Sequence, residues 1–261
     1  MIDQREAIES APTAQDPASS SSPVASGRMW SRFPGAFALI SITVLVFLGQ
    51  TATNQWLGYD WLLEFGVKYR TAIQNGEFWR FITPIFLHLG FAHLFVNMYS
   101  LYAIGPAVER FFGTPRFVST YLLAGVSGVI FSLALSPSSM SAGASGAIFG
   151  MLGALAAFLY RHQGLFGRFG RLQLRQIILI ALLNLGLGLM PGIDNWGHLG
   201  GLIAGAVLGW SLGPRFEVVW AWTDEGQLVD RLPWEQSRIG YLVAAGILSL
   251  LALATLLWIR P

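Results

Sequence analysis

Residues 117 to 160 form a run of 44 consecutive positions without a charged side chain. The hydrocarbon core of a bilayer is about 30 Å thick, and an α-helix crosses it with roughly 20 mostly apolar residues. The run is therefore long enough for two membrane-spanning helices. Small and polar residues near its middle, SPSSMSAG at 136–143, supply a turn that divides it. The composition agrees with a membrane protein, because 54% of the residues are hydrophobic and only 11% are charged.

Further charge-free runs have the length that a spanning helix needs. They lie at 34–59, 81–108, 176–193, 195–214 and 239–259. With the two halves of the longest run they predict seven helices in an all-α polytopic membrane protein, with a six-helix core at 33–214 and a seventh, C-terminal transmembrane helix at 239–261. Arg28 and Arg32 precede the first run, as basic residues precede the core of a signal peptide. No small-x-small cleavage site follows it, so we expect a retained helix.

The segments before and between these runs differ in composition. Residues 1–32 are rich in Ser, Ala and Pro and predict a disordered tail. Residues 51–83 mix large apolar side chains with charged ones, which favours a loop half-sunk in the membrane interface over a fully solvated loop. Residues 215–238 hold tryptophans among acids and bases and predict a polar linker before the seventh helix.

Lysine and arginine predict the orientation, because they gather on the cytoplasmic side of membrane proteins. With seven spans the two termini lie on opposite sides. One orientation collects 12 of the 16 basic residues on the side of the N-terminus and leaves Lys68, Arg70, Arg80 and Arg260 opposite. We therefore expect a cytoplasmic tail and linker and an outer 51–83 loop. Acidic residues in the tail disfavour a transit peptide, so we expect a bacterial inner membrane.

The sequence also argues against several kinds of chemistry. It has no cysteine, and hence no disulfide, thiolate nucleophile or cysteine metal site. It has no HExxH motif and no carboxylates at ligand spacing, so we expect neither a metal nor a cofactor. The net charge is +2 and the pI about 9.1. Because topology explains these cations, we expect no nucleic-acid partner.

Ser145 and His198 begin two of the predicted helices, and both helices enter from the outer side. The two side chains are therefore expected at one depth, close to the outer membrane surface. A serine hydroxyl becomes a good nucleophile when a neighbouring imidazole, with an ordinary pKa of about 6.5, takes its proton. Alone, Ser145 also fits a close helix contact and His198 a buried histidine bonded to a carbonyl. The pair favours catalysis, because polar groups inside a membrane are costly and tend to be functional.

Glycines recur every four residues on the same two helices. They are Gly146 and Gly150 on the first, and Gly197, Gly201, Gly205 and Gly209 on the second. This spacing places them on one helix face and allows two backbones to approach closely. If the two stripes face each other, Ser145 and His198 meet at the outer end of the contact.

His93 and Asn97 are four residues apart and project from one face of the helix predicted in the 81–108 run. A histidine and an asparagine directed at a serine can donate hydrogen bonds to the oxyanion that forms in acyl transfer. Each such donor contributes about 3 kcal/mol to transition-state stability. His88 lies five residues before His93 and off that face.

Five motifs follow one another along the chain. They are FWRFITPIFLH (78–88), HLGFAHLFVN (88–97), GPAVERFFG (105–113), GASGAIFG (143–150) and GHLGGLIAG (197–205). In order and spacing they resemble the rhomboid family of intramembrane serine proteases, over about half of the chain. The resemblance implies a six-helix rhomboid core and an enzyme that cleaves transmembrane protein substrates near the outer boundary of the lipid bilayer.

The resemblance also implies residue roles. Ser145 would be the nucleophile and His198 the general base, without an acidic third member, and we do not assign that role to Asp194 in the turn before His198. His93, Asn97 and the Ser145 backbone N–H would form the oxyanion site.

Supporting roles are implied for Phe149, Gly143, Gly146, Gly201, Arg80 and Glu109. Arg80 would hold the outer loop, and Glu109 would accept hydrogen bonds at the cytoplasmic end of its helix. Phe149 stands where rhomboids often carry a tyrosine that packs under the histidine, so we expect the ring contact to survive without the hydroxyl.

Two rival functions belong to other classes. A catalytically silent rhomboid-like protein that binds and escorts membrane proteins is disfavoured, because both candidate catalytic residues are present. A transporter or channel is disfavoured, because charged residues within spans and broken helices in repeated halves are missing.

Overall fold

The computed structural model describes residues 29–136, 140–220 and 226–259. The chain divides into two units, 1–32 and 33–261. In the first unit Met29–Arg32 form one helical turn, α1, and the rest of the predicted tail lies outside the described residues.

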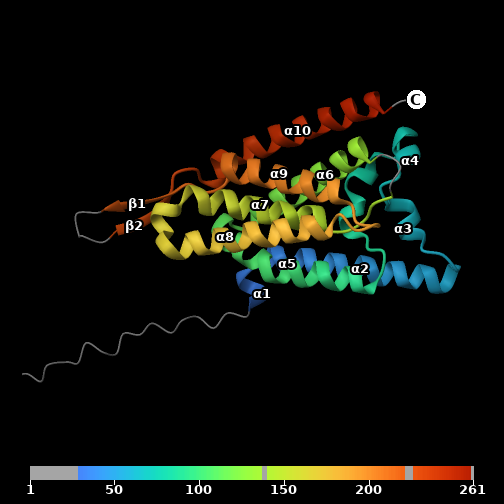
Figure 1. The fold of residues 1–261 in the computed structure, drawn as a ribbon, viewed down its shortest axis with the longest axis horizontal. Helices are drawn as coiled ribbons and strands as arrows, with labels where there is room; N and C mark the ends of the chain where they lie inside the picture. The colour runs from blue at the N-terminus through green and yellow to red at the C-terminus, as the bar shows by residue number, and fades with distance from the viewer. Residues whose placement is uncertain (1–28, 137–139, 221–225, 260–261) are drawn as a thin grey trace, which may run out of the picture. The chain divides into compact units, whose positions relative to one another are not determined.

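The second unit is a helical bundle (Figure 1). Its long helices are α2 (Pro34–Leu57), α5 (Phe91–Phe112), α6 (Thr114–Leu135), α7 (Ser145–Arg161), α8 (Gln163–Leu187), α9 (Asn195–Leu212) and α10 (Trp234–Trp258). Each overlaps one of the seven predicted helices, but α5 begins ten residues after the start of the 81–108 run and α8 begins 13 residues before the 176–193 run. By length and hydropathy α2, α6, α8 and α10 are candidate membrane spans, and α7 is a shorter apolar helix of 17 residues. The chain is a mostly helical, multi-pass membrane protein.

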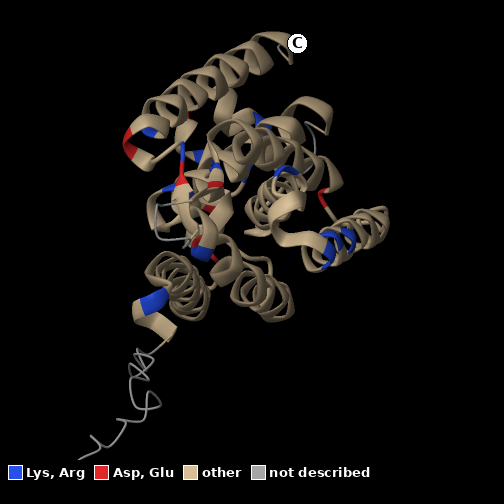
Figure 2. Ribbon diagram, turned by 90° about the vertical axis from the view of Figure 1, so that its left-hand side faces the viewer, with Lys and Arg blue, Asp and Glu red and all other residues tan. Residues whose placement is uncertain are grey.

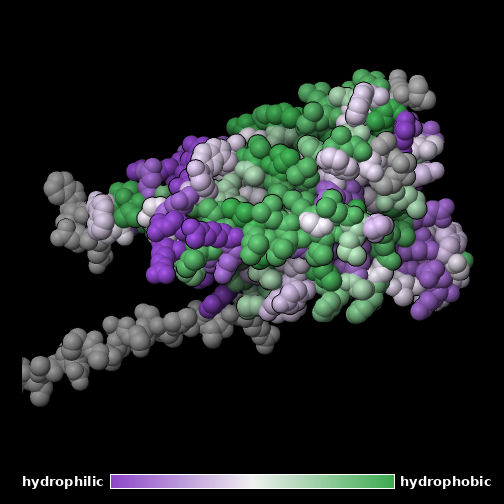
Figure 3. Space-filling model, in the orientation of Figure 1, coloured by the Kyte–Doolittle hydropathy of each residue, from purple (hydrophilic) through white to green (hydrophobic). Residues whose placement is uncertain are grey.

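The surface of this unit has the pattern that a membrane requires. In Figure 3 hydrophobic side chains cover the middle of the bundle, and hydrophilic ones gather toward its two ends. In Figure 2, which looks along the bundle from the end with the β-hairpin, charged segments lie mainly on helix ends and connections, and most of each long helix is tan. A bilayer would bury the apolar belt that water would leave exposed.

Helix α7 lies at the centre of the bundle and is apolar around most of its circumference, as a buried helix must be. Glycines bring its neighbours close. A Cβ added at Gly201 would lie 1.9 Å from the carbonyl oxygen of Gly146, and one at Gly205 would lie 1.9 Å from that of Gly150. The glycine stripes of α7 and α9 therefore face each other and touch backbone to backbone.

The predicted interfacial loop, 51–83, is largely helical. Helix α2 continues through the first seven residues of this loop and ends at Leu57, and Gly58 caps it with a φ of +78°. Short elements follow: α3 (Trp61–Gly66), α4 (Arg70–Gln74) and the 3₁₀ helices η2 (Phe78–Phe81) and η3 (Thr83–Phe86). Trp61, Phe65 and Trp79 stack in this region, with successive ring centroids 5.2 and 5.1 Å apart.

The predicted linker, 215–238, contains an element that the all-α expectation missed. Strands β1 (Phe216–Trp220) and β2 (Gly226–Asp230) form an antiparallel hairpin in which Phe216 pairs with Asp230. Arg116 of α6 holds it through a salt bridge of 2.9 Å to Asp230. Helix α10 begins at Trp234, five residues before the predicted 239, because charged residues that interrupt the apolar run still fit the exposed first turns of a helix.

Candidate active site

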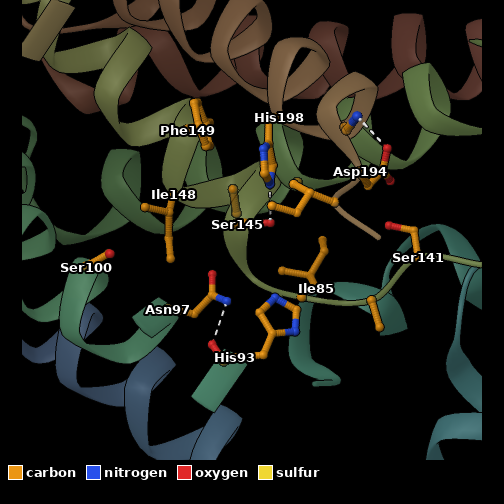
Figure 4. Close-up of a pocket in the computed structure, with 18 of the residues that line it drawn as sticks. Ile85, His93, Asn97, Ser100, Ser141, Ser145, Ile148, Phe149, Asp194 and His198 are labelled. Carbon is orange, nitrogen blue, oxygen red and sulfur yellow. Dashed lines mark hydrogen bonds between the residues drawn. The ribbon is translucent and has the colours of Figure 1, made fainter. Parts of the chain in front are cut away.

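Ser145 and His198 lie side by side at the start of α7 and α9 (Figure 4). His198 Nε2 and Ser145 Oγ are 2.8 Å apart and hydrogen-bonded, although 53 residues separate them in sequence. Both side chains are partly buried. The arrangement has the geometry of a nucleophile and its general base.

Helix packing allows this approach. Gly197 and Gly201 of α9 lie against the backbones of α6 and α7, respectively. A Cβ at Gly128 of α6 would come within 2.6 Å of the Gly197 carbonyl oxygen. A side chain at Gly128 or Gly201 would meet backbone atoms of the facing helix and push α9 outward, whereas one at Gly197 would meet the Asp194 carboxylate. The small residues therefore determine the distance between Ser145 and His198.

The imidazole of His198 stacks on Phe149, with ring centroids 4.4 Å apart and planes 13° from parallel. Its Nδ1 is buried and has no hydrogen-bond partner among the described residues. Asp194 is not directed at it. The Asp194 carboxylate accepts from the backbone N–H of Gly197 at 3.0 Å, as the N-cap of α9, and from Ser132 Oγ at 2.5 Å. An acid–histidine pair is therefore absent among the described residues.

The two side chains open onto a cavity of about 540 Å³. Residues of η3, of α5 to α9 and of the segment before α7 line it, and mostly apolar groups surround a few polar ones. His93 and Asn97 of α5 lie across the cavity from Ser145 (Figure 4). The cavity therefore brings together the four residues to which the sequence assigned catalytic and oxyanion roles.

Gly143 brings the chain close to His93. Its φ is +138°, a region that glycine adopts without strain, and a Cβ there would lie 2.8 Å from His93 Nε2. Its N–H donates to the carbonyl oxygen of Pro84 at 2.8 Å. Asn97 Nδ2 donates one hydrogen bond, of 2.9 Å, to the His93 carbonyl and keeps its second N–H for another acceptor.

His88 is a site neighbour to which the sequence assigned no role. Its ring packs edge-on against His93 with centroids 5.0 Å apart, and its Nε2 lies 3.5 Å from the backbone nitrogen of Ala144. Its backbone pairs with the Gln50 side chain at 3.0 and 3.1 Å. Burial lowers the pKa of His88 to about 4, so the ring is neutral at physiological pH.

Arg80 and Glu109 lie away from the cavity. Arg80 Nη1 donates to the carbonyl oxygens of Glu64 and Val67 at 2.9 and 2.8 Å and thereby links η2 to α3. Glu109 accepts from the backbone N–H groups of Gly35 and Ala36, both at 2.8 Å, at the start of α2. In the described part of the chain no group of three or more His, Asp or Glu side chains is placed to hold a metal ion.

Residues 75–215 match the family model described as Rhomboid domain. Over 179 residues the chain is 42% identical to rhomboid protease GluP of Bacillus subtilis, a match that covers 68% of this chain and 34% of that protein. Over 191 residues it is 34% identical to RHOMBOID-like protein 4 of Arabidopsis thaliana, covering 73% of this chain and 46% of the relative.

A third match, to Rhomboid-like protease 3 of Toxoplasma gondii, is 34% identical over 148 residues and covers 56% of each chain. In all three cases the chain spans less than two thirds of the length of the relative.

Proposed function

The chain belongs to the rhomboid family, and we propose that it is an intramembrane serine endopeptidase that cleaves transmembrane protein substrates near the outer membrane boundary. The observation that carries this proposal is the 2.8 Å hydrogen bond between His198 Nε2 and Ser145 Oγ, inside a cavity that also holds His93 and Asn97. Relatives that carry the name rhomboid protease support it.

In the first half of the reaction Ser145 Oγ attacks the carbonyl carbon of the scissile peptide bond. His198 Nε2 takes the hydroxyl proton, which requires a neutral imidazole with its own proton on Nδ1. The C–N bond then breaks as His198 gives that proton to the leaving amine nitrogen, and an ester between Ser145 and the substrate acyl group remains.

Water completes the reaction. It attacks the ester carbonyl while His198 takes one of its protons, the C–O bond to Ser145 breaks, and the proton returns to Ser145 Oγ. The products are a new carboxyl group and a new amine. Phe149 keeps the imidazole plane in place in both halves, because its ring lies parallel to that of His198.

The negative charge on the carbonyl oxygen needs donors that are already in place. We assign this role to the backbone N–H of Ser145, the second N–H of Asn97 and His93. The N–H of Ser145 is available because the first N–H groups of a helix have no partner within it. Loss of one oxyanion donor costs on the order of 10²-fold to 10³-fold in kcat.

The direct test is cleavage of a single-span substrate by purified protein in liposomes, with product masses read by mass spectrometry. Wild type should cut once near the outer boundary, and Ser145→Ala and His198→Ala should not. Ser127→Ala is the matched control, because Ser127 is a buried serine of α6 that lies outside the cavity. Equal cutting by wild type and Ser145→Ala would refute the assignment of the nucleophile.

A fluorophosphonate probe gives a second measurement that needs no substrate. An activated serine is expected to form a covalent adduct with it, and peptide mapping should place the adduct on Ser145. Without an adduct, and without cleavage of several substrates, the alternative of a catalytically silent binding or escort protein would be favoured.

We further propose a bacterial inner membrane, with the hairpin on the cytoplasmic side and the active site opening to the outer side. The basis is the distribution of Lys and Arg. Because the sequence has no cysteine, single cysteines can report the orientation. In intact cells an impermeant maleimide should label Asn75→Cys in the outer loop and leave Gln227→Cys in the hairpin unlabelled. The reverse pattern would invert the proposed topology.

A further inference from the structure

Lys68 is the single lysine of the sequence and lies between α3 and α4, in the loop predicted to face the outer side. Its side chain is completely buried. Its ammonium donates to Ser132 Oγ of α6 at 2.7 Å and to the Ser136 carbonyl oxygen at 3.2 Å. A loop lysine ordinarily keeps its charged end in water, so this burial requires a structural explanation.

The contact with Ser132 continues to the helix that carries His198. The Ser132 hydroxyl accepts from Lys68 and donates to Asp194 Oδ2 at 2.5 Å. Asp194 Oδ1 accepts from the N–H of Gly197, the residue before His198. Donors and acceptors alternate correctly along this path, from an ammonium through a hydroxyl to a carboxylate and then to the N-terminus of α9.

The backbone of Lys68 reaches the other half of the site. Its N–H donates to the Ser141 carbonyl oxygen at 3.0 Å, and its own carbonyl accepts from the Ser141 N–H at 3.4 Å. Ser141 lies four residues before Ser145 and, like Asp194, lines the cavity (Figure 4). One residue therefore has its backbone bonded to the segment of Ser145 and its side chain linked to the helix of His198.

The chemistry of the site suits lysine better than arginine. Burial lowers the pKa of Lys68 to about 8, and the nearby Asp194 carboxylate opposes that shift. The residue is therefore mostly cationic at neutral pH. An ammonium offers three donors from one small centre, whereas a planar guanidinium is larger and presents its donors in a rigid fork. The other 15 basic residues of the chain are all arginine.

We propose that Lys68 is a positioning residue, which holds the Ser145 segment and the N-terminus of α9 at the spacing that the Ser145–His198 hydrogen bond requires. The part of this inference that concerns catalysis rests on the proposed protease function. The part that concerns the position of the two segments does not.

The first experiment measures backbone amide exchange in detergent by mass spectrometry for wild type, Lys68→Met and Ser132→Ala. Both variants should raise exchange on the order of tenfold in peptides covering 194–199, because each breaks the side-chain path from Lys68 to the N-terminus of α9. Arg70→Met is the matched control, because Arg70 is a cation of the same loop that bonds to the Ile259 carbonyl instead. Exchange at 194–199 in Lys68→Met equal to wild type, or an equal increase in Arg70→Met, would overturn the proposal, whether or not the protein is a protease.

The second experiment uses the fact that the chain has one lysine. In protein labelled with ¹⁵N-lysine, Nζ should give a single side-chain signal that is protected from solvent exchange. Asp194→Asn should shift this signal and Glu64→Gln should not, since only Asp194 lies on the hydrogen-bonded path. A rapidly exchanging signal, or one unmoved by Asp194→Asn, refutes the path even if Lys68→Met does not fold.

Cleavage kinetics then test the catalytic part. A misplaced pair of catalytic groups should lower kcat on the order of tenfold with little change in KM, since positioning acts on the reacting atoms. Lys68→Arg keeps the positive charge, but its kcat should still lie below that of wild type because the guanidinium does not fit the site. The loss of kcat in the Lys68→Met/Ser132→Ala double variant should be smaller than the sum of the two single losses, because both residues act on one path. If wild type cleaves the substrate and the Lys68 and Ser132 variants have the same kcat as wild type, Lys68 does not position the catalytic groups. If wild type cuts nothing while amide exchange changes as expected, the protease proposal fails and the positioning proposal stands.

Discussion

Phe149 lies parallel to the imidazole of His198, 4.4 Å from it, and comes one helical turn after Ser145 on α7. The candidate nucleophile and the ring that supports the candidate base therefore lie on one face of the same helix, one turn apart. Phenylalanine brings no hydroxyl, so its contribution is the stacking itself and the volume of the ring. His198 Nδ1, without a partner among the described residues, gives the imidazole no second anchor.

Replacing Phe149 tests this support. Phe149→Tyr keeps the ring and should retain activity within about twofold, because stacking energy changes little between the two rings. Phe149→Leu keeps apolar volume but loses the flat face, and we expect kcat to fall roughly tenfold, as for a contact of about 1.4 kcal/mol. Steady-state cleavage kinetics, with thermal unfolding as the check on folding, measure both. Equal activity in Phe149→Leu and wild type would mean that stacking does not orient the base.

Glu109 stabilises the start of α2. Its two carboxylate oxygens accept from the N–H groups of Gly35 and Ala36, and Thr114 Oγ1 donates to it at 2.6 Å. The negative charge of Glu109 also lies at the N-terminus of α2, which is the positive end of that helix dipole. Glu109→Gln places an NH₂ group against one of these donors and should cost about 1 to 3 kcal/mol of unfolding free energy. Thermal unfolding in detergent measures the loss.

Glu235→Gln is the control for that measurement, because Glu235 is exposed in the first turn of α10. It removes the same charge without touching a buried partner and should leave the transition within the error of the method. Equal shifts for the two variants would show that the effect of Glu109 is one of net charge.

Gly201 tests the close contact of α7 and α9. A Cβ at this position would lie 1.9 Å from the Gly146 carbonyl oxygen, which is backbone and cannot rotate away. Gly201→Ala should therefore move α9, lengthen the Ser145–His198 distance and reduce kcat more than tenfold. Gly246→Ala on α10 is the control, since nothing lies within 4 Å of its added methyl group. It should be neutral or slightly stabilising, as alanine is the better helix former by about 1 kcal/mol.

The approximate positions of the seven helices could be read from the sequence, because a bilayer leaves few alternatives to an apolar helix of about 20 residues. The first 13 residues of α8 were missed, because Arg168, Arg171 and Arg175 interrupt its apolar run. The juxtaposition of Ser145 and His198 was also predictable. Both residues begin helices on the same predicted side, and the four-residue spacing of glycines indicated which faces meet. These arguments depend on periodicity and on the distribution of Lys and Arg along the chain, and neither requires knowing which distant residues are in contact.

The partners of Lys68 are of another kind. Its acceptors Ser132 and Ser136 lie 64 and 68 residues further along the chain, so no local pattern distinguishes Lys68 from a solvated loop cation. The β1–β2 hairpin was missed because two five-residue strands with mostly exposed side chains give little periodic signal. The N-cap by Asp194 had a local signal that was not used, an aspartate directly before an apolar run.

The final prediction concerns acid stability and depends on His88. Burial lowers its pKa to about 4 in the folded protein, with a smaller contribution of the same sign from His93. In the unfolded chain a histidine takes up its proton near pH 6.5. Unfolding therefore binds a proton between pH 6.5 and 4, so the free energy of unfolding falls as the pH is lowered through this range and is fully retained above it.

The separation of these two pKa values corresponds to roughly 3 kcal/mol of unfolding free energy lost by about pH 4. His88→Gln removes the titrating group and leaves the backbone bonds to Gln50 in place, so its stability should fall less steeply with acid than that of wild type. Unfolding temperatures in detergent from pH 7 to 4 measure the difference. His162→Gln serves as comparison, because burial also lowers the pKa of His162, which lies between α7 and α8 and bonds to the N–H of Phe216. Parallel curves for wild type and His88→Gln would show that His88 is already protonated or exposed in the folded protein.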